Sequence, residues 1–184
     1  MRLLILDRDG VINEDSDAFI KHPDEWVPIE GSLHAIAMAT RAGARVVVCT
    51  NQSGVARGLF DVSRLHQIHQ KMLAAVSAAG GMIDAIFFCP HAPEDKCDCR
   101  KPQPGMLHEI ARRLRVPLEY VPAIGDRESD IAAARAAGAR PVLVMTGAGR
   151  ETADIIGQAR DVAVYPDLAA VVEHMLATEW VGSH

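Results

Sequence analysis

The chain has 184 residues, of which 49% are apolar and 23% are charged, and its formal net charge is −5 at pH 7. This length and composition favour one soluble globular domain with a complete hydrophobic core. The negative net charge argues against a nucleic-acid-binding surface, and no apolar run reaches the length of a membrane span. The first apolar run ends at Asp7, so we expect a buried strand there rather than a signal peptide, and a cytoplasmic location.

Short apolar runs alternate with longer amphipathic segments along the chain. We predict strands at 3–6, 45–49, 83–88, 120–124, 141–145 and 161–165. The predicted helices span 32–42, 62–79, 106–114, 128–137, 152–159 and 168–178. This alternation predicts an α/β fold, with a single Rossmann-like domain over 1–184 and an open parallel sheet covered by helices on both faces. No linker divides the chain, and no insertion is large enough to form a cap domain.

Aspartates follow the first and fourth predicted strands. Asp7 and Asp9 are two residues apart and should point the same way in an extended chain, with Gly10 allowing a sharp turn behind them. Asp126 follows the fourth strand, with Asp130 one helical turn later. Aspartates also end strands and cap helices without binding metal. Ligands bind at the carboxyl ends of parallel strands, however, so we predict a Mg²⁺ site formed by Asp7, Asp9 and Asp126.

A second candidate metal site lies in the segment CPHAPEDKCDCRKP. Its potential ligands are Cys89, His91, Cys97 and Cys99. Three thiolates and one imidazole form a closed tetrahedral Zn²⁺ site, which is structural because no position stays open for water. The alternative is that the cysteines pack as small hydrophobic residues beside a surface histidine, and disulfides are disfavoured in a reducing compartment. Zinc would hold a loop over 89–104 and fix Arg100 and Lys101, which follow the last ligand.

Four motifs, in order, resemble those of the haloacid dehalogenase superfamily of phosphotransferases. DRDGVIN matches the first motif, VVVCT the second at Thr50, Lys101 the third and GDRESD the fourth, and together they cover nearly the whole chain. The resemblance implies that Asp7 is a nucleophile forming an aspartyl-phosphate. It implies that Asp9 is first the general acid and then the base that activates water. Thr50, Lys101 and Mg²⁺ would stabilise the transferring phosphoryl group.

A narrower resemblance is carried by DRDGVIN, TNQSGVARG and CRKPQPGM. These stretches are similar to zinc-containing heptose bisphosphate phosphatases and to the related histidinol-phosphate phosphatases. The first group implies removal of the C7 phosphate from a phosphorylated sugar on the way to the ADP-heptose of lipopolysaccharide. Histidinol-phosphate hydrolysis in histidine biosynthesis is the alternative. The residues implied to contact the substrate are Asp15, Ser16, Asp17, Ala18, Asn51, Gln52, Ser53, Arg100, Lys101 and Arg127.

The least secure part of this resemblance is the loop after DRDGVIN, where the family often has a Gly-Tyr pair and this chain reads EDSDAFIKHPDEW. Two other classes stay open. A catalytically silent phosphosugar-binding or zinc-scaffold protein is disfavoured because Asp7 and Asp9 are both intact, and a DNA-end 3′-phosphatase is disfavoured by the acidic charge balance. We expect a monomer with no nucleic-acid or membrane partner.

Other polar residues receive ordinary interpretations. Arg57 is a further cation expected near the site, and Cys49 should be buried in its strand. The remaining histidines considered, His22, His66, His69, His108 and His174, have no partner at ligand spacing, so we interpret them as ordinary helix or loop residues.

Overall fold

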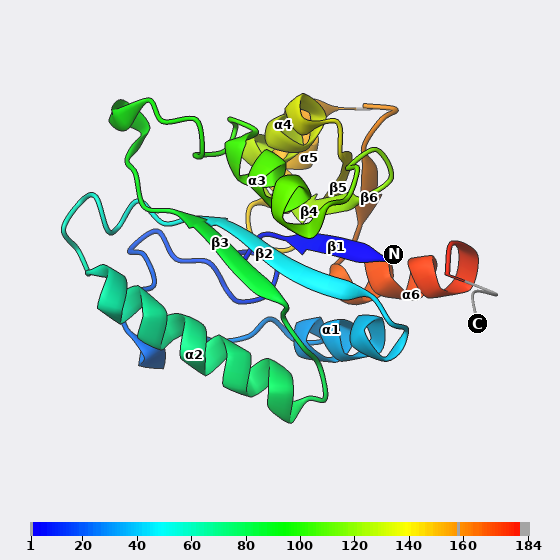
Figure 1. Ribbon diagram of the computed structural model, residues 1–184, viewed down its shortest axis with the longest axis horizontal. Coiled ribbons are helices and arrows are strands. Elements are labelled where there is room, and N and C mark those ends of the chain that lie inside the picture. The colour runs from blue at the N-terminus through cyan, green and yellow to red at the C-terminus, as the bar shows by residue number, and fades with distance from the viewer. Residues whose placement is uncertain (1, 158, 181–184) are drawn as a thin grey trace.

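The computed structural model describes residues 2–157 and 159–180. Short runs of buried apolar residues form a six-stranded sheet in the order β3-β2-β1-β4-β5-β6 (Figure 1). The strands are β1 (Leu3–Leu6), β2 (Arg45–Asn51), β3 (Ala85–Cys89), β4 (Pro122–Gly125), β5 (Arg140–Val144) and β6 (Ala163–Tyr165). Every neighbouring pair is parallel. The predicted open parallel sheet with Rossmann-like strand order is confirmed.

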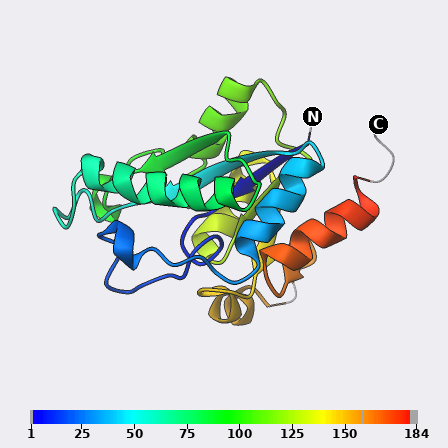
Figure 2. The ribbon, with the colours of Figure 1, turned by 90° about the horizontal axis from the view of Figure 1, so that it is seen from below.

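Helices cover both faces of the sheet (Figures 1 and 2). One face carries α1 (Ser32–Arg41), α2 (Val62–Ala78) and α6 (Leu168–Thr178). The other carries α3 (Gly105–Leu114), α4 (Glu128–Ala137) and α5 (Gly149–Ile156). Within β1, Leu4 packs on the first face and Ile5 on the second. Because both faces are buried, the strand reads as a continuous apolar run rather than an alternating one.

The repeated string AGAR forms the same helix-to-strand junction twice. It leads from α1 into β2 and from α4 into β5, and its glycines have φ of 75° at Gly43 and 71° at Gly138. A left-handed residue ends a helix by turning its backbone away from the helical path, and glycine adopts that conformation without a Cβ clash. The helices therefore stop within a residue of the positions that the sequence predicts.

Apart from α5, every predicted strand and helix begins and ends within two residues of its predicted bounds. Two of the differences have a clear cause in strand pairing or in how a helix ends. Strand β2 continues to Asn51 because this residue still pairs with Cys89 of β3. Helix α5 covers 149–156 rather than 152–159. It ends early because Gly157 has a φ of 57°, and residue 158 of the predicted range lies outside the described residues.

The segment 7–31 between β1 and α1 contains one short 3-10 turn, Pro23–Glu25, and no folded insertion. Its Trp26 is buried in the core beside α1 and α2. Because it holds only this one short turn, segment 7–31 does not form a cap domain over the carboxyl edge of the sheet. In the described parts of the chain, no helix combines the length and apolarity that crossing a membrane requires.

Candidate active site

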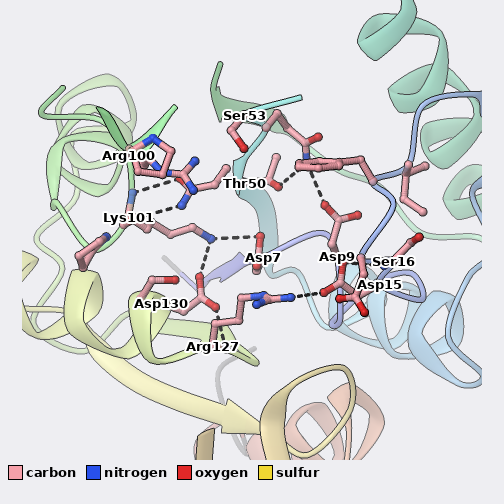
Figure 3. Close-up of a pocket in the computed structure, with 18 of the residues that line it drawn as sticks. Asp7, Asp9, Asp15, Ser16, Thr50, Ser53, Arg100, Lys101, Arg127 and Asp130 are labelled. Carbon is pink, nitrogen blue, oxygen red and sulfur yellow. Dashed lines mark hydrogen bonds and ion pairs between the residues drawn. The ribbon is translucent and has the colours of Figure 1, made fainter. Parts of the chain in front are cut away.

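The loops that follow β1, β2, β3 and β4 meet at the carboxyl edge of the sheet around a cavity of about 570 Å³ (Figure 3). Most of the predicted site residues line it: Asp7, Asp9, Asp15, Ser16, Asp17, Thr50, Asn51, Gln52, Ser53, Arg57, Arg100, Lys101 and Arg127. Outside the predicted zinc site, two predicted residues do not. Asp126 is fully buried behind Gly10, and Ala18 lines a neighbouring cavity with Phe19 and Lys21. The convergence expected from the strand order is thus present.

Asp7 and Lys101 form a buried ion pair at the floor of the cavity. The Lys101 ammonium lies 3.0 Å from Asp7 Oδ1 and 2.5 Å from Asp130 Oδ1 (Figure 3), and it donates to the Cys49 carbonyl at 2.7 Å. Burial opposes its charge, but the Asp130 and Asp7 carboxylates raise the pKa of Lys101 above its usual value. The lysine is therefore protonated at neutral pH and holds a fixed positive charge against Asp7.

The ionised form of Asp7 is unfavourable when Lys101 is the only cation nearby. Burial, together with the charges of Asp130, Asp126 and Asp9, raises its pKa to about 8, although Lys101 opposes the shift. Two or more carboxylates in one buried site repel each other, and a positive ion placed among them removes that penalty.

The geometry around Asp126 fits a hard divalent cation. Ligand oxygens of Asp7, Asp126 and Asp130 all lie within 4.8 Å of one another. Asp126 Oδ2 accepts from the Ala148 amide at 2.8 Å, whereas Oδ1 is buried with no hydrogen-bond partner within the described residues. Gly10 has a φ of 78°, and a Cβ there would lie 2.1 Å from Asp126 Oδ2. Oxygen ligands packed this closely suit Mg²⁺.

Asp9 does not join that carboxylate group. Arg8 holds it through contacts from Nε to Oδ1 at 3.0 Å and from Nη2 to Oδ1 and Oδ2 at 2.8 and 3.0 Å. Asn13 donates to Oδ1 and Gln52 to Oδ2, each at 2.9 Å. Burial acts in the opposite direction, yet Arg8 and these donors lower the pKa of Asp9. The predicted role of Asp9 as a magnesium ligand stays a prediction, since it would require these contacts to open.

Asn51 and Gln52, in the sequence TNQS after β2, hold neighbouring site residues in place through hydrogen bonds. The Asn51 amide bonds the Lys101 backbone in both directions, from Nδ2 to the carbonyl at 3.0 Å and from the Lys101 N–H to Oδ1 at 3.1 Å. Gln52 donates to Thr50 Oγ1 at 3.0 Å as well as to Asp9. Asn51 thus ties the lysine-bearing loop to the end of β2, while Thr50 and Ser53 remain at the cavity wall.

An ion pair joins two of the loops across the cavity mouth. Arg127, which follows β4, pairs with Asp15 from the loop after β1 (Figure 3). Arg57 and Arg100 line the same cavity from the loops after β2 and β3. Arg57 and Arg100 therefore add positive charge at an opening where Arg127 is already paired with Asp15, which favours an anionic substrate.

The four predicted zinc ligands form one cluster. The Sγ atoms of Cys89, Cys97 and Cys99 are 3.2 to 3.6 Å apart, and His91 Nδ1 lies 3.5 and 3.3 Å from the sulfurs of Cys89 and Cys99. Thiolates at the corners of a zinc tetrahedron lie about 3.8 Å apart, given Zn–S bonds of about 2.3 Å. The sulfurs are too far apart for disulfides. The residues therefore fit a closed structural zinc site.

Two contributors to the site, Arg8 and His69, were not predicted from the sequence, and Asp130 has a contact that was not expected. Asp130, which follows Asp126 by one helical turn, is also the second partner of Lys101, and Arg8 is the partner of Asp9. His69, interpreted above as an ordinary helix residue, is instead buried on α2 with Nε2 at 3.2 Å from Arg8 Nη1. An arginine between two aspartates in DRDG was an available signal for Arg8. No local pattern indicated His69, because its partner is 61 residues away.

Comparison with known proteins identifies the class that this fold and site define. Residues 98–171 match the family described as HAD-hydrolase-like. The D-glycero-beta-D-manno-heptose-1,7-bisphosphate 7-phosphatase of Bordetella bronchiseptica is 56% identical over 96% of this chain and 98% of its own length. Its Pseudomonas putida counterpart is 49% identical over 96% of this chain and 100% of its own length. The chain is therefore a phosphatase of the haloacid dehalogenase class.

The structural matches agree. The crystal structure of D,D-heptose 1,7-bisphosphate phosphatase from B. bronchiseptica, complexed with magnesium and phosphate, covers 96% of this chain and 99% of its own with a TM-score of 0.94. The Burkholderia thailandensis structure of that name covers 97% of this chain and 100% of its own, with 41% identity and a TM-score of 0.77. The chain belongs to the family of D-glycero-beta-D-manno-heptose-1,7-bisphosphate 7-phosphatases.

Proposed function

We propose that this phosphatase is Mg²⁺-dependent and removes the C7 phosphate of D-glycero-β-D-manno-heptose 1,7-bisphosphate through an aspartyl-phosphate. The observation that carries the chemistry is the buried Asp7–Lys101 pair beside the unpartnered Asp126 Oδ1. The substrate and its anomer are supported by the names of relatives that match nearly the whole chain. The magnesium and phosphate in the Bordetella structure support the cofactor.

In the first half-reaction an oxygen of Asp7 attacks the C7 phosphorus. The new bond joins Asp7 to phosphorus, and the bond from phosphorus to the sugar oxygen breaks. Asp9 donates its proton to that oxygen, so the sugar leaves as an alcohol. Lys101 stays protonated and offsets the negative charge of the transferring group. Thr50 Oγ1, at the cavity wall, is available to donate to a phosphoryl oxygen.

In the second half-reaction a water molecule attacks the phosphorus of the aspartyl-phosphate. Asp9, now a carboxylate, takes a proton from this water, the bond from phosphorus to Asp7 breaks, and inorganic phosphate is released. The lowered pKa of Asp9 matches this basic form. The proton needed for the first half-reaction is taken up when the substrate binds, because a phosphate dianion nearby raises the carboxyl pKa.

Asp7 and Asp126 would hold the magnesium ion, with Asp130 beside them. When bound, Mg²⁺ neutralises the negative charge of the carboxylates and of the phosphoryl oxygens, which otherwise repel each other. The raised pKa values of Asp7 and Asp126, to about 8 and about 7, follow from burial first and then from carboxylate repulsion.

A Zn²⁺ ion held by the cysteine cluster serves as a clamp in this proposal. Arg100 and Lys101 follow the last ligand directly, and Arg100 Nη1 also bonds the His91 carbonyl at 3.2 Å. A loop rich in proline and charge has little apolar surface to pack, so bonds to zinc would fix its path. The clamp aims both cations at the cavity, and the zinc has no part in the bond-breaking steps.

Replacing Cys99 with serine should remove the zinc and loosen the loop. We expect zinc content to fall from one equivalent to below about half an equivalent and Tm to fall by about 5 °C or more. KM should rise more than kcat falls. Zinc analysis, thermal unfolding and steady-state kinetics measure these effects. Cys49→Ala is the matched control, since Cys49 lies outside the cluster and its loss should leave the zinc content unchanged. A large loss of kcat with KM and Tm unchanged would contradict the clamp.

The decisive test of the substrate is a comparison of kcat/KM values. We expect the β-anomer of the heptose bisphosphate to exceed histidinol phosphate by about 100-fold or more, since additional phosphate contacts each contribute a few kcal/mol. Phosphate release with both substrates, at matched enzyme and magnesium concentrations, supplies the values. A preference for histidinol phosphate would overturn the assignment in favour of histidine biosynthesis.

The proposed context is the cytoplasmic route to the ADP-heptose of lipopolysaccharide. A phosphorylated sugar is the partner that the enzyme class implies. We propose that the enzyme acts as a monomer and binds neither nucleic acid nor membrane, in keeping with its negative net charge.

A further inference from the structure

Arg8 is a buried cation whose side chain does not line the active-site cavity. Its side chain is 1% exposed, while that of its partner Asp9 is 20% exposed. Three of its contacts go to Asp9, through Nε and Nη2. A guanidinium is planar, so the plane defined by these contacts fixes where Nη1 points. Nη1 is directed away from the active site towards helix α2.

The group that meets Nη1 is His69. Its Nε2 lies 3.2 Å from Nη1, and the imidazole is 4% exposed. A guanidinium has donors only, so Nε2 must be the unprotonated nitrogen that accepts this bond. The ring also packs edge-on against Phe88 of β3, with centroids 6.1 Å apart. The imidazole is thus held on one side by β3 and presents its acceptor to Arg8 on the other.

We propose that His69 is a positioning residue for the acid–base step: it fixes the Arg8 guanidinium, which in turn holds the Asp9 carboxyl. The chain of contacts runs from α2 through Arg8 to Asp9, a path of two hydrogen-bonded links. Without an acceptor at position 69, Nη1 would be a buried donor left unpaired, and the guanidinium would rotate towards another acceptor. The Asp9 carboxyl would then no longer be held by the guanidinium in the orientation that directs its proton towards the leaving-group oxygen.

The remaining contacts of Asp9 cannot supply this orientation alone. Asn13 Nδ2 donates to Asp9 Oδ1, and its Oδ1 accepts from the buried Trp26 indole at 2.9 Å. Gln52 donates to Oδ2 from the other side and also to Thr50. These are single donors to one oxygen each, whereas Arg8 reaches both oxygens from one rigid plane. The histidine therefore acts on the contact that fixes the carboxylate plane.

The test uses two substrates that differ in their need for an acid. The leaving group of the sugar phosphate is an alkoxide, which needs a proton to leave readily. The leaving group of p-nitrophenyl phosphate is p-nitrophenolate, which is stable without one. For His69→Leu we expect kcat/KM to fall by about 10- to 100-fold on the heptose bisphosphate but by less than about threefold on p-nitrophenyl phosphate. The ratio kcat/KM reports steps through formation of the aspartyl-phosphate, so the second half-reaction does not blur the comparison.

His69→Gln should restore most of the lost activity, to within about threefold of the wild type, because its Oε1 keeps an acceptor at comparable reach. His69→Asn keeps polarity but is too short, so it should behave like His69→Leu and carries the test if the leucine variant does not fold. Ile68→Val, a buried neighbour on α2, controls for weakened packing, and the exposed His66→Leu controls for loss of an imidazole. Both controls should retain the wild-type ratio between the two substrates.

Equal losses on both substrates, or no loss on either, would overturn the positioning role and leave His69 as a packing residue. The inference rests on the proposed phosphatase function, and the two can fail separately. If the wild-type enzyme hydrolyses p-nitrophenyl phosphate but not the heptose bisphosphate, the proposed substrate is wrong. In that case kcat/KM of the His69 variants is compared between p-nitrophenyl phosphate and any alkyl phosphate that the enzyme hydrolyses.

Discussion

Asp7→Asn should abolish turnover, lowering kcat by about 10⁴-fold or more, because removal of a covalent nucleophile leaves only binding and electrostatic stabilisation. The amide has nearly the same shape as the carboxylate, so the fold and the Lys101 loop should persist. Phosphate release under single-turnover conditions measures the loss, and acid-quenched protein should carry no acyl-phosphate. Turnover within tenfold of the wild type would contradict the aspartyl-phosphate mechanism.

Measurements of thermal stability show whether the loss of turnover in Asp7→Asn comes from the missing nucleophile or from unfolding of the variant. The Asp7 pKa is raised from 3.8 to about 8 by burial and by the neighbouring carboxylates, so the native state binds a proton that the unfolded state releases between these pH values. Metal-free wild-type protein should therefore lose stability as pH rises from about 4 to about 8. The asparagine variant has no such group. Its Tm relative to the wild type, measured with EDTA, should rise from pH 5 to pH 8, and a fall over this range would contradict the assignment.

Lys101→Met should damage catalysis and stability together. The lysine is the cation between two buried carboxylates, 3.0 Å from Asp7 and 2.5 Å from Asp130. Its loss removes charge stabilisation from the transferring phosphoryl group, and we expect kcat to fall by about 10²- to 10³-fold. Leaving buried carboxylates without their partner should lower the unfolding free energy by about 3 kcal/mol or more. The loss of stability follows from the ion pairs, because Lys101 is the partner of two buried carboxylates.

A double variant separates the two effects. Lys101→Met combined with Asp130→Asn removes the cation and one of its two carboxylate partners, so much of the lost stability should return. The lost kcat should not return, because the transferring group still lacks its cation. Urea unfolding and steady-state kinetics on the single and double variants supply both numbers. Recovery of kcat in the double variant would show that Lys101 acts only by holding the loop.

Local sequence patterns predicted the scaffold well. Helix α4 and helix α6 have the predicted bounds, and β1 does too. Runs of buried apolar residues and glycine helix ends act within a few residues, so they can be read directly from the chain. Helix α5 lies three residues earlier than predicted, because it ends at Gly157 and the predicted range ran past this glycine. A glycine can end a helix or lie within one, and the residue type alone does not decide between the two.

For the candidate site too, the sequence predicted which residues are involved but not how their side chains are arranged. The spacing of the cysteines and histidine identified the cluster. The resemblance carried by DRDGVIN, TNQSGVARG and CRKPQPGM identified most of the cavity lining. Where each side chain points could not be predicted. Ala18 turned towards a neighbouring cavity, Asn51 bonded the Lys101 backbone, and Asp9 was held apart from the other carboxylates.

By itself, the sequence determined the class of fold and the two sets of candidate metal ligands, because these follow from apolar runs and from residue types after each strand. The catalytic roles proposed for Asp7 and Asp9 came from the resemblance of DRDGVIN to a known family motif. Only the tertiary structure decided which of these groups meet. Lys101 meets Asp7 and Asp130, and His69 on α2 meets Arg8, across 61 residues of chain. Such contacts depend on how helices and loops pack at the sheet edge, and burial then gives them their strength, because charges separated from water interact more strongly.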